Sequence, residues 1–86
     1  MCTYLTEQVA VEGSGKGAGG WFPLTGASVY FDHPVHAQAG HTLNIDFLNP
    51  QRGPSARVAV ELTAESARAL AAAIESALAA APPGLL

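Results

Sequence analysis

The last quarter of the sequence carries the pattern that most limits the fold. Residues 64–81 are alanine-rich, and within them large apolar residues recur every four positions, at Leu70, Ile74 and Leu78. This spacing predicts an amphipathic helix with one narrow apolar stripe, enough to lie on one face of a sheet. Thr63 is placed to cap its first amides, and the Pro-Pro-Gly sequence that follows stops it, leaving residues 82–86 as a tail.

The rest of the chain alternates in the manner of strands. Apolar and polar residues take turns in four stretches, which we expect to be strands: 3–12, 27–31, 42–48 and 57–62. The turn-forming run 49–55 makes an antiparallel hairpin of the last two. With 86 residues, the chain has the length of one domain, residues 1–86. The expected fold class is α+β: an antiparallel sheet of about four strands, covered on one face by a single C-terminal helix.

Residues 13–20 contain five glycines in eight positions. Because ordering glycine is entropically costly, this Gly-rich loop is expected to be a mobile connection, or a lid with Trp21 at its apolar edge. It does not fit a phosphate-binding loop. Gly17 stands where Ser or Thr would have to reach Mg²⁺, and the glycines and Pro23 that follow forbid the required helix. No nucleotide cofactor is expected.

The amino-acid composition limits the kinds of partner that the chain can bind. Hydrophobic residues make up 49% of the chain and charged residues 13%, with a formal charge of −3. So few charges leave apolar surface exposed on a monomer, and we expect a homodimer. The four basic residues are scattered, so no nucleic acid is expected. The sequence has no apolar run of about 18 residues and no secretory signal, so we expect no membrane partner and a cytoplasmic location.

All three histidines, His33, His36 and His41, fall within nine residues. Neutral imidazole commonly binds Zn, Cu, Ni or Fe, so the cluster predicts a divalent transition metal. Asp32 or Asp46 would orient these ligands or replace one. Cys2 is another candidate ligand. The first hypothesis is therefore a small metal-binding protein that could act as a metal-dependent enzyme of specialised metabolism. The spacing matches no known zinc motif. The three histidines could equally have separate structural roles, with His33 in a turn, His36 in a solvated loop and His41 on a buried face.

Two other functions remain open. One is a non-catalytic homodimeric binding or accessory module with an aromatic ligand surface formed by Tyr4, Trp21 and Tyr30. The other is metal-free acid–base catalysis by His33 or His36. In addition, four polar side chains of the last two strands share one sheet face: Asn44, Asp46, Arg57 and Glu61. They could form a cross-strand ion pair or bind a small polar ligand.

The N-terminal Met-Cys-Thr and the segments GSGKGAGGWF, DHPVHA, LNIDF and ARVAVEL resemble those of a family of short, uncharacterised actinobacterial proteins. The resemblance covers most of residues 1–80. It implies a stand-alone domain in which DHPVHA is a family feature, and it implies no particular activity.

Overall fold

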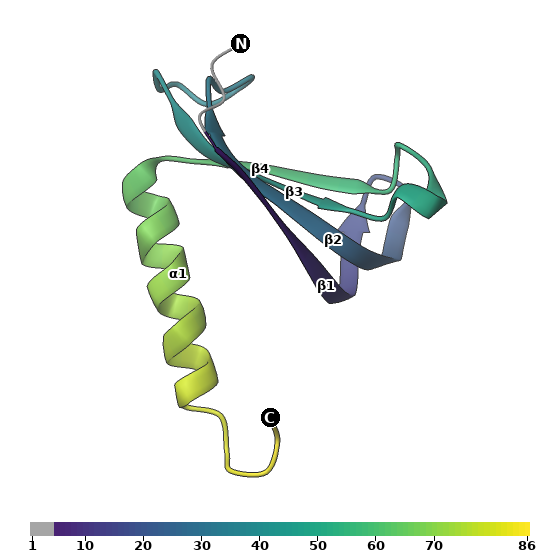
Figure 1. The fold of residues 1–86 in the computed structure, drawn as a ribbon, viewed down its shortest axis with the longest axis vertical. Helices are drawn as coiled ribbons and strands as arrows, with labels where there is room; N and C mark the ends of the chain where they lie inside the picture. Colours follow the sequence, from purple (N-terminus) through teal and green to yellow (C-terminus); the bar gives the residue numbers. More distant parts are fainter. Residues whose placement is uncertain (1–4) are drawn as a thin grey trace.

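The computed structural model describes residues 5–86. Its elements are β1 (Thr6–Gly17), β2 (Gly20–Asp32), β3 (Thr42–Leu48), the 3-10 turn η1 (Pro50–Arg52), β4 (Arg57–Leu62) and α1 (Ala64–Ala79). The strands form one antiparallel sheet in the order β1-β2-β3-β4 (Figure 1). The predicted α+β class, a four-stranded antiparallel sheet with a C-terminal helix, is confirmed.

The glycine-rich segment is not a loop, and that prediction was wrong. β1 runs through to Gly17 and β2 starts at Gly20, so only residues 18 and 19 form the turn. The reason is packing. A Cβ on Gly15 would lie 3.1 Å from a methyl carbon of Leu24, and one on Gly17 would lie 3.2 Å from the ring of Phe22. Glycine therefore lets large side chains of β2 lie directly against the backbone of β1.

β2 is also longer than the predicted strand at 27–31. Its pairing with β3 begins at Gly26, so the preceding residues pair with β1 alone. Pro23 is tolerated there because one side of the strand needs no ladder hydrogen bond. Beyond a register shift between Ala10 and Gly13, this end of the hairpin turns out of the plane of the remaining sheet (Figure 1).

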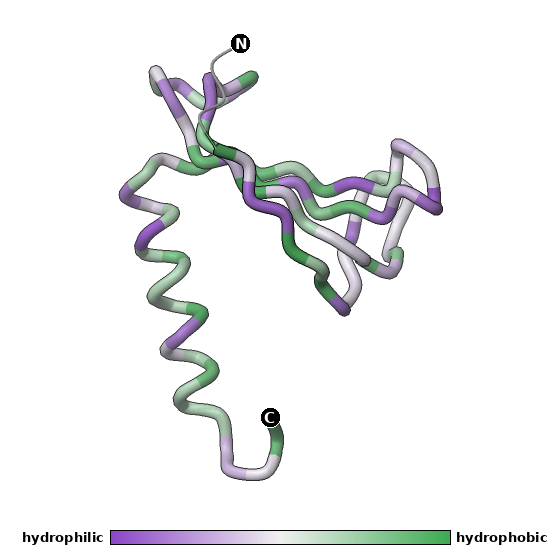
Figure 2. The backbone as a smooth tube through the Cα atoms, viewed as in Figure 1, coloured by the Kyte–Doolittle hydropathy of each residue, from purple (hydrophilic) through white to green (hydrophobic). Residues whose placement is uncertain are grey.

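The central strands separate polar from apolar residues. Tyr30 pairs with Asn44, and Asn44 pairs with Glu61, so these three share one face. The neighbouring set Val29, Ile45 and Val60 faces the other way. The sheet therefore has a polar face and an apolar face, and hydrophilic and hydrophobic residues alternate along its strands (Figure 2). The helix lies on the apolar side, where it borders a gap together with Val29, Ile45 and Leu62.

α1 begins as predicted and ends at Ala79, two residues before the predicted Ala81. Thr63 Oγ1 accepts a hydrogen bond from the Ser66 amide at 3.1 Å, the expected N-cap. The helix touches the sheet near its first turns and then points away from it (Figure 1). The stripe residue Ile74 is consequently 52% exposed. Within residues 5–86, the only buried hydrophobic side chains are those of Ala27 and Ala56.

Candidate functional site

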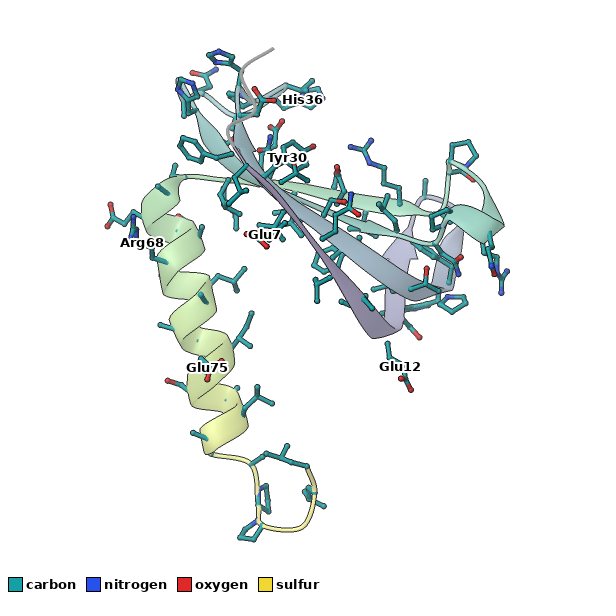
Figure 3. The ribbon with its side chains drawn as sticks, in the orientation of Figure 1. Glu7, Glu12, Tyr30, His36, Arg68 and Glu75 are labelled. Carbon is teal, nitrogen blue, oxygen red and sulfur yellow. The ribbon has the colours of Figure 1, made fainter. Side chains whose placement is uncertain are left out.

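A hollow of about 730 Å³ opens on the polar face of the sheet, between β2–β4 and the segment that follows β2. We call residues 33–41 the histidine loop and this recess the polar hollow. Polar and charged side chains supply much of its lining: Tyr30, Asp32, His33, His36, Asn44, Asp46, Arg57 and Glu61. Tyr30 and His36 lie on the same side of the sheet (Figure 3).

Glu61 fixes the histidine loop above the sheet. Its carboxylate accepts three backbone hydrogen bonds, from the amides of Val35 at 2.5 Å, His36 at 3.0 Å and Ala37 at 2.9 Å. These hydrogen bonds, with that of Val35 foremost, hold the pKa of Glu61 below its ordinary value of 4.5. One side chain at the end of β4 thus positions a segment about 25 residues earlier in the chain, and so builds one wall of the hollow.

Asp46 organises the floor of the hollow. Its Oδ2 accepts a hydrogen bond from the Tyr30 hydroxyl at 2.9 Å, and its Oδ1 accepts one from Arg57 Nη2 at 2.8 Å. The ion pair between Asp46 and Arg57, considered from the sequence, is therefore present. Burial, followed by the hydrogen bond and negative charge of Asp46, raises the pKa of Tyr30 above 10.0. The Tyr30 hydroxyl consequently stays protonated and keeps its hydrogen bond to Asp46.

The three histidines do not converge. The rings of His33 and His41 lie 4.3 Å apart between centroids, and His41 also stacks on Phe31. His33 Nδ1 is 2.9 Å from the carbonyl oxygen of Gly40, and His33 and His36 both line the polar hollow. In the part of the chain that the structure describes, no group of three or more His, Cys, Asp or Glu residues could hold a metal ion.

The two described candidates for supporting ligands, Asp32 and Asp46, accept hydrogen bonds within the protein. Asp32 Oδ1 accepts a hydrogen bond from the His33 backbone amide at 2.7 Å. Asp46 is engaged by Tyr30 and Arg57 instead of a histidine. Cys2, the third candidate, lies outside the described residues.

The proposed aromatic surface is not one surface among residues 5–86. Trp21 is 71% exposed near the tip of the β1–β2 hairpin and lines a separate shallow hollow with Leu24 and Phe47. Tyr30 lines the polar hollow. Tyr4 lies outside the described residues.

Sequence reasoning placed the polar groups of β3 and β4 on one face, but it missed what two residues do there. The bond from Tyr30 to Asp46 follows from strand register, which the short predicted strand left undefined. The capture of loop amides by Glu61 has no local signature. The only sequence feature that could have indicated this role is the position of Glu61 near the end of a strand, on the same face as the other polar side chains of β3 and β4.

Fold and hollow together define a small α+β domain that presents a polar recess on one face of an antiparallel sheet. The chain belongs to a family of unknown function, DUF6295, whose model matches residues 1–86. Comparison with curated proteins and with solved structures finds no match. Among residues 5–86, no helix combines the length and apolar character needed to cross a bilayer.

Proposed function

We propose that the protein is a non-catalytic binding module that takes a small polar molecule in the polar hollow. The observation that carries the proposal is the anchoring of the histidine loop by Glu61, which holds His36 above the paired Tyr30, Asp46 and Arg57. A concave site in which a few oriented polar groups accompany an aromatic ring is typical of small-molecule recognition.

The chemistry of the hollow favours an uncharged ligand rich in oxygen acceptors. Asp46 and Glu61 already accept hydrogen bonds from the protein itself. Arg57 is half-exposed, and its guanidinium has N–H groups beyond the one bonded to Asp46. The groups that remain for a ligand are therefore chiefly donors. Because one Arg faces three carboxylates, those of Asp32, Asp46 and Glu61, the hollow repels anions, so we propose a sugar-like or amide-like molecule.

Amide chemical-shift titration of ¹⁵N-labelled protein tests this site. We expect saturable shifts at Tyr30, His36 and Arg57 with glucose or N-acetylglucosamine, and none with citrate. Arg57→Gln should weaken that binding by about tenfold or more, because a hydrogen bond from a charged donor is lost. Arg52→Gln is the matched control, since Arg52 lies on η1 and does not line the hollow. Failure of both sugars to saturate, or wild-type binding by Arg57→Gln, would contradict the site.

Metal binding is the second candidate, favoured by the closeness of the His33 and His41 rings. Two imidazoles can bind a divalent transition metal, although more weakly than a complete ligand set. Under this candidate, calorimetric titration with Zn²⁺ gives one weak site. The His33→Ala/His41→Ala double variant should abolish it, and His36→Ala should leave it unchanged. Loss of binding in His36→Ala, or heat from Zn²⁺ that survives the double variant, counts against a His33–His41 site.

A cytoplasmic location and an actinobacterial source complete the proposal. They are supported by the single cysteine and by the alanine-rich composition of the chain, respectively.

A further inference from the structure

The face of the sheet opposite the polar hollow has an apolar surface that the described chain covers only in part. This apolar face consists of Val29, Leu43, Ile45, Val60 and Leu62, and each of these side chains is only half-buried. In a finished domain such residues form the core and are removed from water. Here they line an open surface instead.

The apolar stripe of α1 is exposed next to that face. Leu70 is 43% exposed, Ile74 52% and Leu78 49%. Between the helix and the sheet lies an apolar gap of about 340 Å³, bordered by Val29, Ile45 and Leu62 on one side and by Leu70 and Ile74 on the other. Helix and sheet thus form two sides of an open wedge, which widens as the helix leaves the sheet (Figure 1).

The chain exposes more surface than a compact monomer of its size. The chain exposes 6385 Å², whereas a folded monomer of its mass exposes about 4,800 Å². Its radius of gyration is 14.4 Å, against about 12 Å for a compact chain of this length. The excess of about 1,600 Å² is twice what one partner contributes to a standard stable interface, about 800 Å². The exposed surface is therefore large enough to form a standard stable interface.

We infer that this partner is a second copy of the chain, and that each copy inserts α1 into the wedge of the other. Both complementary surfaces, a helix stripe and an apolar sheet face, are present in every chain, so a two-fold arrangement buries all of them at once. Glu7 on the outer strand and Arg68 on the helix border the wedge with opposite charges. The polar hollow lies on the opposite face, so dimerisation leaves it open and its ligand binding can be tested separately.

Light scattering after size-exclusion chromatography tests the inference with two variants. Wild type should have about twice the chain mass of 8.8 kDa. Ile74→Glu places a charge on the stripe and should raise the dimer dissociation constant about a hundredfold or more, because the charge would be buried unpaired. Ala72→Glu adds the same charge to the opposite, exposed side of α1 and should remain dimeric. Monomeric wild type, or an Ile74→Glu dimer that persists on dilution as far as wild type does, overturns the inference.

A second measurement keeps the inference testable if Ile74→Glu does not fold. In a mixed dimer of ¹³C-labelled and unlabelled wild-type chains, filtered NOEs should connect the methyls of Ile74 in one copy with those of Val29 and Ile45 in the other. A dimer with only sheet-to-sheet NOEs overturns the helix insertion. Co-sedimentation of monomeric protein with phosphatidylcholine vesicles would show that a lipid surface covers the wedge instead, and would likewise overturn the inference.

Discussion

Glu61→Gln is expected to release the histidine loop from the sheet while leaving the strand ladder intact. The amides of Val35, His36 and Ala37 then lose a charged acceptor, which the neutral amide replaces poorly. In native-state hydrogen exchange, these three amides should exchange at the rate of an unprotected peptide, whereas the protection of β3 and β4 should persist. Ligand shifts at His36 should disappear with them.

The same contact makes the loop sensitive to acid. Because the pKa of Glu61 is lowered in the folded chain, its stabilising contribution is present above its ordinary pKa of 4.5 and is lost as the pH falls through the lower folded value. The loop amides should therefore become exchange-labile on acidification, and Glu61→Gln should abolish that transition.

Glu65→Gln is the matched control, since Glu65 is exposed in the first turn of α1 and bonds no loop amide in the described structure. Equal protection of the loop amides in wild type and Glu61→Gln would refute the anchoring role.

Asp46→Ala is expected to lower the free energy of unfolding by about 1–2 kcal/mol. The hydrogen bond from the part-buried Tyr30 hydroxyl contributes about 1 kcal/mol. The pair with Arg57 adds about 0–1 kcal/mol, because the guanidinium is half-exposed and solvent screens it. Urea unfolding at one fixed protein concentration measures the difference, and Tyr30→Phe should account for about 1 kcal/mol of it.

Asp46→Asn separates the charge from the hydrogen bond. Burial is the largest cause of the raised pKa of Tyr30, and the hydrogen bond and negative charge of Asp46 come next. Removing the charge should therefore lower the Tyr30 pKa toward 10.0 without fully restoring it. Phenolate absorbance measured against pH reports this change. Unchanged urea unfolding in Asp46→Ala, or an unchanged Tyr30 titration in Asp46→Asn, would mean that Asp46 does not organise the floor of the hollow.

Elements with a regular apolar period were predictable from the sequence. β3 and β4 have the predicted bounds, and α1 starts at Ala64 as expected. In these elements the spacing of the apolar residues indicates which side of the strand or helix faces apolar surroundings. The glycine-rich segment is a strand where a loop was predicted, because the sequence indicates only the entropic cost of ordering glycine and not the contacts that offset it. The entropic cost of ordering these glycines is offset by the packing of Leu24 and Phe22 against their backbone. That packing forms only when β1 and β2 are paired, so the local sequence does not reveal it.

The candidate site also has a part that the sequence predicts and a part that it does not. Strand parity placed Asp46 and Arg57 on one face, and their ion pair is present. Strand parity could not place the histidine loop, because the hydrogen bonds from its amides to Glu61 span 24 to 26 residues and follow no periodic rule. Clustering in sequence was also misleading: the rings of His33 and His41 meet, yet the described residues contain no group of three possible metal ligands that includes His36.

The central claim is that one chain is half of a finished fold, with its apolar side closed by a second copy and its polar hollow facing outward. Sedimentation equilibrium of the wild-type chain, paired with thermal unfolding at several protein concentrations, tests it most directly. The account predicts a mass of about twice 8.8 kDa and a melting temperature that rises with concentration, because folding and association are coupled. A species of 8.8 kDa that unfolds cooperatively at a concentration-independent temperature would contradict it.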